Sequence, residues 1–150
     1  MREEKIISYW SDMYSRPNVF GTGPTKLAKM ANDLIYDKSI QNILEIGCGQ
    51  GRDSIFFSEK GYSIETFDIS ENAITFVNKT KKSFNLKNLN AIVHDVTEPF
   101  SYPNIFFDFV YSNLALQFFN IDSLEKIFNN IYRVMNDDAT ILFSTKKKGD

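Results

Sequence analysis

Residues 43–51 read Ile-Leu-Glu-Ile-Gly-Cys-Gly-Gln-Gly, so a short apolar run leads into three glycines at alternate positions. The apolar run predicts a buried strand, and the glycines predict a tight turn after it. Because glycine has no Cβ, a turn built from Gly47, Gly49 and Gly51 lets the backbone approach a ligand closely. The helix expected next would aim its free N–H groups into the same space. We therefore interpret this segment as a cofactor loop between a strand and a helix.

Three residues around the loop indicate which kind of cofactor it would hold. Glu45 precedes the first glycine, where a carboxylate would repel a pyrophosphate and attract an ammonium or sulfonium group. Arg52 stands where the dinucleotide fingerprint G-x-G-x-x-G, counted from Gly47, requires its last glycine. Asp68 ends the next apolar run, and its two oxygens can accept both hydroxyls of a ribose. These features favour a cationic ligand that carries a ribose.

Helix and strand patterns alternate along the chain after two initial helices. Apolar residues at helical spacing predict these helices at residues 3–15 and 24–36, the second with Pro24 as its first helical residue. The later elements are expected in the order strand 42–46, helix 51–60, strand 63–67, helix 71–84, strand 90–93, strand 107–112, helix 121–135 and strand 139–145. This alternation predicts an α/β fold, with a doubly wound, mainly parallel sheet and helices on both faces.

Polar residues occupy the expected carboxyl ends of four strands: Glu45, Asp68, Asp95 and Asn113. In a doubly wound sheet, ligands bind at these ends, where the strand order reverses. Solvent-exposed loop starts could also place polar residues there by chance. We favour the functional interpretation because all four residues would meet at one edge of the sheet.

On these motifs the chain resembles the class I S-adenosylmethionine-dependent methyltransferases. Their first four motifs are similar, in order, to residues 45–51, 67–70, 94–96 and 107–113, and residues 133–145 resemble the turn into their fifth strand. The resemblance implies one Rossmann-like domain over residues 1–150, with S-adenosylmethionine as cofactor and S-adenosylhomocysteine as product. It also implies that the last two strands of the usual fold are missing, because the sequence stops after the fifth.

The N-terminal segment is similar to that of methyltransferases of the tellurite-resistance and thiopurine type, which act on small molecules or soft nucleophiles. The residues that carry this similarity are Tyr9, Trp10 and Tyr14, followed by Phe20-Gly21-Thr22-Gly23-Pro24. The implied partner is a small-molecule methyl acceptor. The implied reaction is an in-line attack of the acceptor on the sulfonium methyl group, for which alignment and exclusion of water can suffice without a catalytic base.

The resemblance also implies which residues contact the cofactor, with Asp68 on the ribose and Asp95 at the adenine amino group. The expected contacts are Tyr14, Glu45, Gly47, Cys48, Gly49, Gly51, Asp68, Ile69, Asp95, Val96 and Asn113. No catalytic residue and no metal ligand are assigned.

Other residues are candidates for contact with the acceptor. Gln117, Phe118 and Tyr14 are placed there, with Tyr9 and Trp10 as parts of a lid. For the aromatic residues, packing of an N-terminal helix on the core is an equal alternative.

Two residues invite a catalytic role that we do not favour. His94 is the only histidine, but a residue next to a strand-end acid usually points to the opposite face. Cys48 is the only cysteine, and we expect it to pack beneath the loop as a small apolar side chain. A single cysteine also excludes a disulfide within the chain.

Charge and hydropathy limit the possible partners. Seventeen basic and nineteen acidic residues give a net charge of −2, which offers no broad footprint for nucleic acid or an anionic membrane. No apolar run is long enough to span a membrane, and the N-terminus begins an amphipathic helix. We expect a cytoplasmic protein, monomeric or paired with a second copy through a free sheet edge.

Two other functions stay open. A nicotinamide-dependent oxidoreductase domain would also use a glycine-rich loop and Asp68, although Glu45, Arg52 and Asp95 argue against it. A non-catalytic module that binds S-adenosylmethionine is the other alternative.

Overall fold

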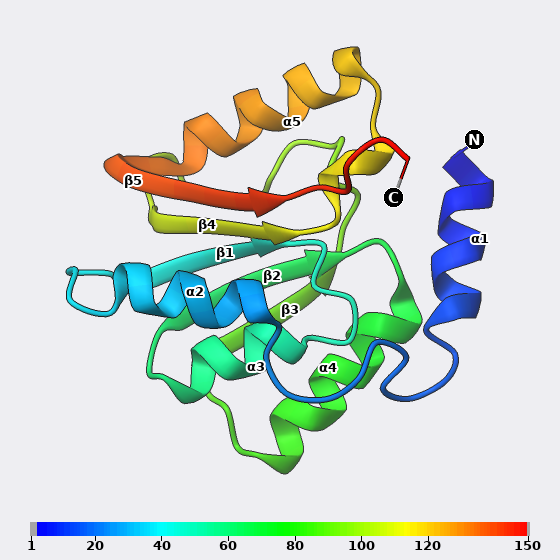
Figure 1. Ribbon diagram of the computed structural model, residues 1–150, viewed down its shortest axis with the longest axis horizontal. Coiled ribbons are helices and arrows are strands. Elements are labelled where there is room, and N and C mark those ends of the chain that lie inside the picture. Colours follow the sequence, from blue (N-terminus) through cyan, green and yellow to red (C-terminus); the bar gives the residue numbers. More distant parts are fainter. Residues whose placement is uncertain (1–2, 150) are drawn as a thin grey trace.

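The computed structural model describes residues 3–149, which form five parallel strands and the helices that cover them (Figure 1). The elements in chain order are α1 (Glu3–Met13), α2 (Lys26–Ile35), β1 (Asn42–Ile46), α3 (Arg52–Glu59), β2 (Ser63–Asp68), α4 (Glu71–Ser83), β3 (Leu89–Val93), β4 (Phe107–Asn113), the 3₁₀ helix η1 (Leu116–Phe118), α5 (Ile121–Val134) and β5 (Met135–Ser144). The predicted order of helices and strands is confirmed.

The strands lie in the order β3-β2-β1-β4-β5, so the order reverses at β1. β1 pairs in parallel with β2 on one side and with β4 on the other. The chain therefore winds outward from β1 in both directions, as predicted for a doubly wound sheet. The carboxyl ends of β1 and β4 open a crevice at this switch point, which is where such folds bind ligands.

Helices cover both faces of the sheet (Figure 1). On one face, α2, α3 and α4 bury apolar side chains against the strands, among them Ala28, Phe57 and Val77. On the other face, α5 contributes Ile127, Ile131 and Val134 to a second core. Ser70 is the N-cap of α4, and its side chain accepts a hydrogen bond from the Ala73 N–H at 3.2 Å.

The connection from β3 to β4 crosses the second face without a helix in residues 94–106. Val96 and Phe100 pack from this segment into the core that α5 covers. Arg133 of α5 donates hydrogen bonds to the carbonyl oxygens of Phe100 at 2.6 Å and Tyr102 at 2.9 Å. Arg133 thus satisfies two backbone carbonyl groups of a segment that has no helical hydrogen bonds of its own.

Most boundaries differ from the prediction by one or two residues, and two of the differences matter here. α5 continues directly into β5, which begins at Met135 rather than at residue 139, because Met135 already pairs with Phe107. Pro24 is not the first residue of α2, because Thr25 is the N-cap and its side chain accepts a hydrogen bond from the Ala28 N–H. The proline therefore lies just before the helix.

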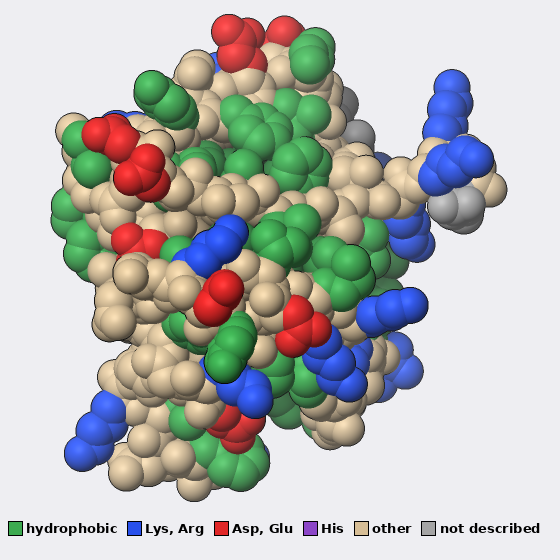
Figure 2. Space-filling model, turned by 60° about the vertical axis from the view of Figure 1, so that its left-hand side comes forward, with side chains coloured by type: hydrophobic (Ala, Val, Ile, Leu, Met, Phe, Trp, Pro, Cys, Tyr) green, Lys and Arg blue, Asp and Glu red, His purple; other side chains and the backbone are tan. Residues whose placement is uncertain are grey.

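The surface carries both signs of charge. On the face shown in Figure 2, acidic and basic side chains lie among hydrophobic ones, and neither sign covers the face alone. This matches the small net charge of −2. No helix in residues 3–149 is long and apolar enough to cross a membrane.

Candidate functional site

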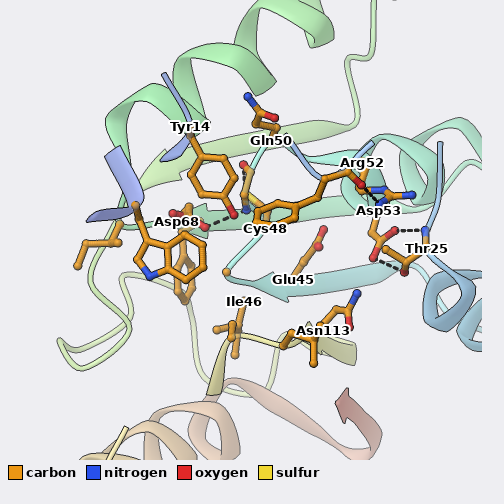
Figure 3. A pocket seen from close by; sticks show the side chains of 18 of the residues that line it. Tyr14, Thr25, Glu45, Ile46, Cys48, Gln50, Arg52, Asp53, Asp68 and Asn113 are labelled. Atoms are coloured by element: carbon orange, nitrogen blue, oxygen red, sulfur yellow. Dashed lines mark hydrogen bonds between the residues drawn. The ribbon is translucent and has the colours of Figure 1, made fainter. Parts of the chain in front are cut away.

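A cleft of about 1470 Å³ opens at the carboxyl ends of β1, β2 and β4, and α1 stands beside it (Figures 1 and 3). The cleft is lined by all but one of the predicted cofactor contacts: Tyr14, Glu45, Gly47, Cys48, Gly49, Asp68, Ile69, Asp95, Val96 and Asn113. These residues come from four strand ends, the glycine loop and the segment after α1. The fold therefore brings together positions that are up to 99 residues apart in sequence.

Gly51 is the exception, because it does not line the cleft. It is the N-cap of α3 with φ +79°, and a Cβ at this position would lie 2.7 Å from Cγ2 of Val77 on α4. Its lack of a side chain allows helix α4 to pack closely behind the loop. We therefore assign Gly51 to packing and not to ligand contact.

Gly49 faces the cleft from the loop. Its φ is +54°, and a Cβ there would lie 2.6 Å from the hydroxyl oxygen of Tyr14. Burial and the nearby Asp68 carboxylate raise the pKa of Tyr14, so its hydroxyl stays protonated at neutral pH. The bare loop and a potential hydrogen-bond donor thus lie side by side.

Asp68 supports the loop as well as facing the cleft. Its Oδ2 accepts a hydrogen bond from the Gly49 N–H at 2.8 Å, and its Oδ1 accepts one from the Ser70 N–H at 3.0 Å. The sequence predicted contacts of both oxygens with a ribose, and these two contacts with the backbone are additional. Each carboxylate oxygen has two lone pairs, so one acceptor position remains on each. Burial raises the pKa of Asp68, and these backbone N–H groups oppose that rise.

Glu45 lies beneath the loop and is only 3% exposed. Ser54, in the first turn of α3, donates a hydrogen bond to its Oε2. Burial raises the pKa of Glu45 well above its ordinary value, and the neighbouring Asp53 carboxylate adds to this rise. A cationic ligand would oppose both effects, which keeps the predicted attraction to an ammonium or sulfonium group physically reasonable.

Asp95, two residues after β3, and Asn113, the last residue of β4, frame the cleft. The Oδ1 of Asp95 accepts hydrogen bonds from the Thr97 N–H at 2.8 Å and the Thr97 hydroxyl at 2.7 Å. Asn113 Oδ1 accepts one from the Ser144 hydroxyl at 2.5 Å. Among the described residues, the remaining Asp95 oxygen and the Asn113 amide N–H groups are left for a ligand.

Cys48 and His94 do not show catalytic geometry. Cys48 belongs to the buried core, and burial raises the pKa of its thiol, so it is not a reactive thiolate. The ring of His94 packs edge-on against Phe67 at 5.1 Å and Phe100 at 5.9 Å between centroids. Its Nε2 lies 3.3 Å from the carbonyl oxygen of Glu98. These contacts hold the ring by packing. His94 nevertheless lines the same cleft as Asp95, so the expectation that it points to the opposite face was wrong.

Aromatic side chains span the cleft from the N-terminal helix to η1. Trp10 stacks on Tyr14 at 5.7 Å between ring centroids and meets Phe118 edge-on at 5.4 Å. Tyr9 and Phe20 extend this row at either side, at 5.1 Å from Trp10 and 6.0 Å from Tyr14. We call these five rings the aromatic bridge. Gln117, predicted to contact the acceptor, lines the cleft, and its Oε1 accepts a hydrogen bond from the Lys146 N–H at 2.7 Å.

Residues 25–144 match the model of a family described as tellurite resistance protein TehB. The chain belongs to this family. Over 94 residues it is 34% identical to a probable S-adenosyl-L-methionine-dependent methyltransferase TehB of Haemophilus influenzae, covering 63% of this chain and 32% of that protein. The crystal structure of TehB from Haemophilus influenzae superposes with a TM-score of 0.70 at 28% identity, covering 91% of this chain and 44% of that one.

A second kind of relative is malonyl-[acyl-carrier protein] O-methyltransferase 1 of Ilyobacter polytropus. It is 34% identical over 114 residues, covering 72% of this chain and 39% of that protein. The chain spans less than half the length of each of these relatives. The resemblance to class I methyltransferases inferred from the motifs is confirmed at the level of family and fold.

Three polar residues of this TehB-family chain have roles that the motifs did not reveal. Gln50 lies between the last two glycines, and Arg52 and Asp53 follow them. Each of the three holds the segment between α1 and α2. We call this segment, residues 15–25, the strap. Arg52 had stood out only as a departure from the dinucleotide fingerprint, and no spacing pattern in the sequence pointed to its partners.

Asp53 is the most buried of the three, at 3% exposed. Its Oδ1 accepts a hydrogen bond from the Thr25 N–H, and its Oδ2 accepts one from the Thr25 hydroxyl, both at 2.7 Å (Figure 3). The hydroxyl of Tyr111, on β4, also donates to Oδ2 at 2.7 Å. This network joins the strap, α3 and the sheet.

In residues 3–149 no group of three or more His, Cys, Asp and Glu side chains could hold a metal ion.

Proposed function

We propose that this chain binds S-adenosylmethionine in the cleft and transfers its methyl group to a small-molecule acceptor, leaving S-adenosylhomocysteine. The observation that carries the proposal is the convergence of Gly49, Asp68, Asp95 and Asn113 on one cleft at the switch point of the sheet. The name of the Haemophilus influenzae relative, a probable S-adenosyl-L-methionine-dependent methyltransferase, supports the same cofactor.

The residues present fit this cofactor. Asp68 keeps one acceptor position on each oxygen for two ribose hydroxyls, and Asp95 keeps one oxygen for an amino group. Gly47 and Gly49 line the cleft and carry no Cβ, so their backbone can approach a ligand closely. Buried Glu45 lies where a positive charge would be stabilised.

The cofactor supplies, when bound, a methyl group on a sulfonium leaving group. The chain then needs chiefly to align the acceptor and exclude water, and no residue is assigned as a base. The aromatic bridge lies over one end of the cleft. Its apolar rings can contact an acceptor on one side and exclude water from the methyl group, which supports the proposed transfer. The cleft volume of about 1470 Å³ exceeds the roughly 300–1,000 Å³ of a typical single-ligand pocket. Two ligands therefore have room to meet there.

The test is isothermal titration of the chain with S-adenosylmethionine, S-adenosylhomocysteine and NADH in parallel. We expect both adenosyl ligands to bind with Kd values of about 1–100 μM and NADH to give no heat. Binding of NADH would instead favour the oxidoreductase alternative, and binding of none would refute the proposed site.

Methyl transfer is tested separately with labelled cofactor and a panel of small O, N and S nucleophiles. Binding without transfer, in this chain and in a form as long as its relatives, would favour a non-catalytic binding module. The cytoplasmic location and the monomeric or homodimeric state remain predictions from the sequence.

A further inference from the structure

The strap is fastened to Gln50 within the glycine loop and to Arg52 and Asp53 directly after it. Gln50 holds it in both directions, since its Nε2 donates to the Arg16 carbonyl at 2.7 Å and its Oε1 accepts the Val19 N–H at 2.9 Å. Arg52 and Asp53 hold the next part of the strap up to Thr25. The strap is thus fixed along most of its length by one short stretch of the chain.

Arg52 makes an unusual set of contacts for an arginine. Its guanidinium donates to three backbone carbonyls of one tight turn: Phe20, Thr22 at 3.4 Å and Gly23 at 2.6 Å. A guanidinium presents five N–H donors in a rigid plane, so one side chain can fix several carbonyl groups at once. The conformation of residues 20–23 therefore depends on Arg52 more than on any side chain within the turn.

The strap in turn carries the aromatic bridge. Tyr14 directly precedes the strap and Phe20 lies within it, and Trp10 stacks on Tyr14. Residues 20–25 line the same cleft as the glycine loop. A shift of the strap would therefore move both the ring that touches Gly49 and the rings over the far end of the cleft.

We propose that Arg52 is a positioning residue that holds the strap, and with it Trp10 and Tyr14, closed over the cleft. The cofactor that the closed strap covers rests on the proposed function above. Because the strap lines the cleft beside the glycine loop, loosening of these contacts should speed the release of a ligand from that loop. Arg52 thereby slows ligand release and keeps the aromatic bridge in place. Because Arg52 also lines the cleft, its effect on the strap is read from Trp10 in the ligand-free protein.

Trp10 is the only tryptophan in the chain, so its fluorescence reports on the aromatic bridge directly. The test compares acrylamide quenching of Trp10 in the wild type, Arg52→Met and Arg16→Met. Arg16 is the matched control, since it is an exposed arginine on the strap whose backbone carbonyl, rather than its side chain, makes the contact to Gln50. Both substitutions remove one positive charge.

We expect the ligand-free quenching constant to rise about twofold in Arg52→Met and to stay at the wild-type value in Arg16→Met. With S-adenosylhomocysteine as the probe, stopped-flow dissociation should become about fivefold faster in Arg52→Met only. Gln50→Ala removes the two hydrogen bonds between Gln50 and the strap. It should also raise the quenching constant and speed dissociation. Circular dichroism and thermal melts show whether each variant is folded.

Equal quenching in wild type and folded Arg52→Met, or an equal rise in Arg16→Met, would overturn the proposal. The quenching comparison needs no ligand. A wild type that fails to bind S-adenosylhomocysteine would therefore refute the proposed cofactor while the role of Arg52 is still decided by Trp10.

Discussion

The hydroxyl oxygen of Tyr14 lies 2.6 Å from the point that a Cβ on Gly49 would occupy. A residue of the N-terminal segment thus rests directly on the loop that follows β1. Glycine at this position serves two purposes, because it allows φ +54° and leaves room for the tyrosine. The glycine loop and the segment that carries Tyr14 therefore pack against each other directly at Gly49.

Gly49→Ala should consequently weaken binding of S-adenosylhomocysteine by about tenfold or more, or about 1.4 kcal/mol, because the new methyl group displaces Tyr14 and intrudes on the loop. Calorimetric titration measures the loss. The matched control is Gly61→Ala, at φ +96° with nothing within 4 Å of the new Cβ. That variant bears similar backbone strain, of about 1–2 kcal/mol, away from the cleft. Equal losses of affinity would show that strain alone, and not the contact with Tyr14, explains the effect.

The residues at the strand ends could be predicted from sequence because parallel topology alone brings them together. Once β1, β2 and β4 are parallel neighbours, Glu45, Asp68 and Asn113 end at one edge whatever their side chains contact. The prediction was less accurate about what those side chains do. The contacts of Asp68 with the Gly49 and Ser70 N–H groups depend on loop conformation, which residue spacing does not encode.

The fastening of the strap could not be predicted from residue types. Gln50 and Arg52 bind backbone groups about thirty positions earlier in the chain, and every residue carries such groups. No pattern therefore marks their partners. The start of β5 was missed for a related reason, since the polar run after Met135 is typical of a turn, but pairing of Met135 with Phe107 extends the strand.

Asp68→Ala should weaken adenosyl-ligand binding by more than about tenfold, because it removes the acceptors for the ribose and frees the Gly49 N–H. It should also lower the free energy of unfolding by about 1–3 kcal/mol, since two backbone donors lose a partner in a buried place. Titration and urea unfolding measure the two effects, and Asp33→Ala on the exposed side of α2 is the control. Unchanged affinity in the folded variant would remove Asp68 from the site.

The buried carboxyl of Glu45 should make stability depend on pH. Its pKa in the folded state is raised above the ordinary value of 4.5, so the folded chain binds this proton more tightly than the unfolded chain. The stabilisation is fully present below pH 4.5 and is lost as pH rises from there through the raised pKa.

Glu45→Gln removes this titration. The Tm of the wild type should therefore fall relative to that of Glu45→Gln as pH rises above 4.5, with the two closest at lower pH. Thermal melts across a pH series give the difference, and exposed Glu125→Gln is the control. A constant difference between wild type and Glu45→Gln at all pH values would contradict the raised pKa.

Tyr111→Phe tests the buried network that ties the strap to the sheet. The substitution removes only the hydroxyl that donates to Asp53 Oδ2 at 2.7 Å and leaves the ring packed against Phe57 at 5.2 Å between centroids. Asp53 then keeps its two bonds from Thr25 but loses a donor in a buried position. We expect the free energy of unfolding in urea to fall by about 1–3 kcal/mol.

Tyr132→Phe makes the same chemical change on a side chain that is 83% exposed, and it should alter stability by less than about 0.5 kcal/mol. Similar losses in both variants would mean that the hydroxyl of Tyr111 contributes nothing through Asp53.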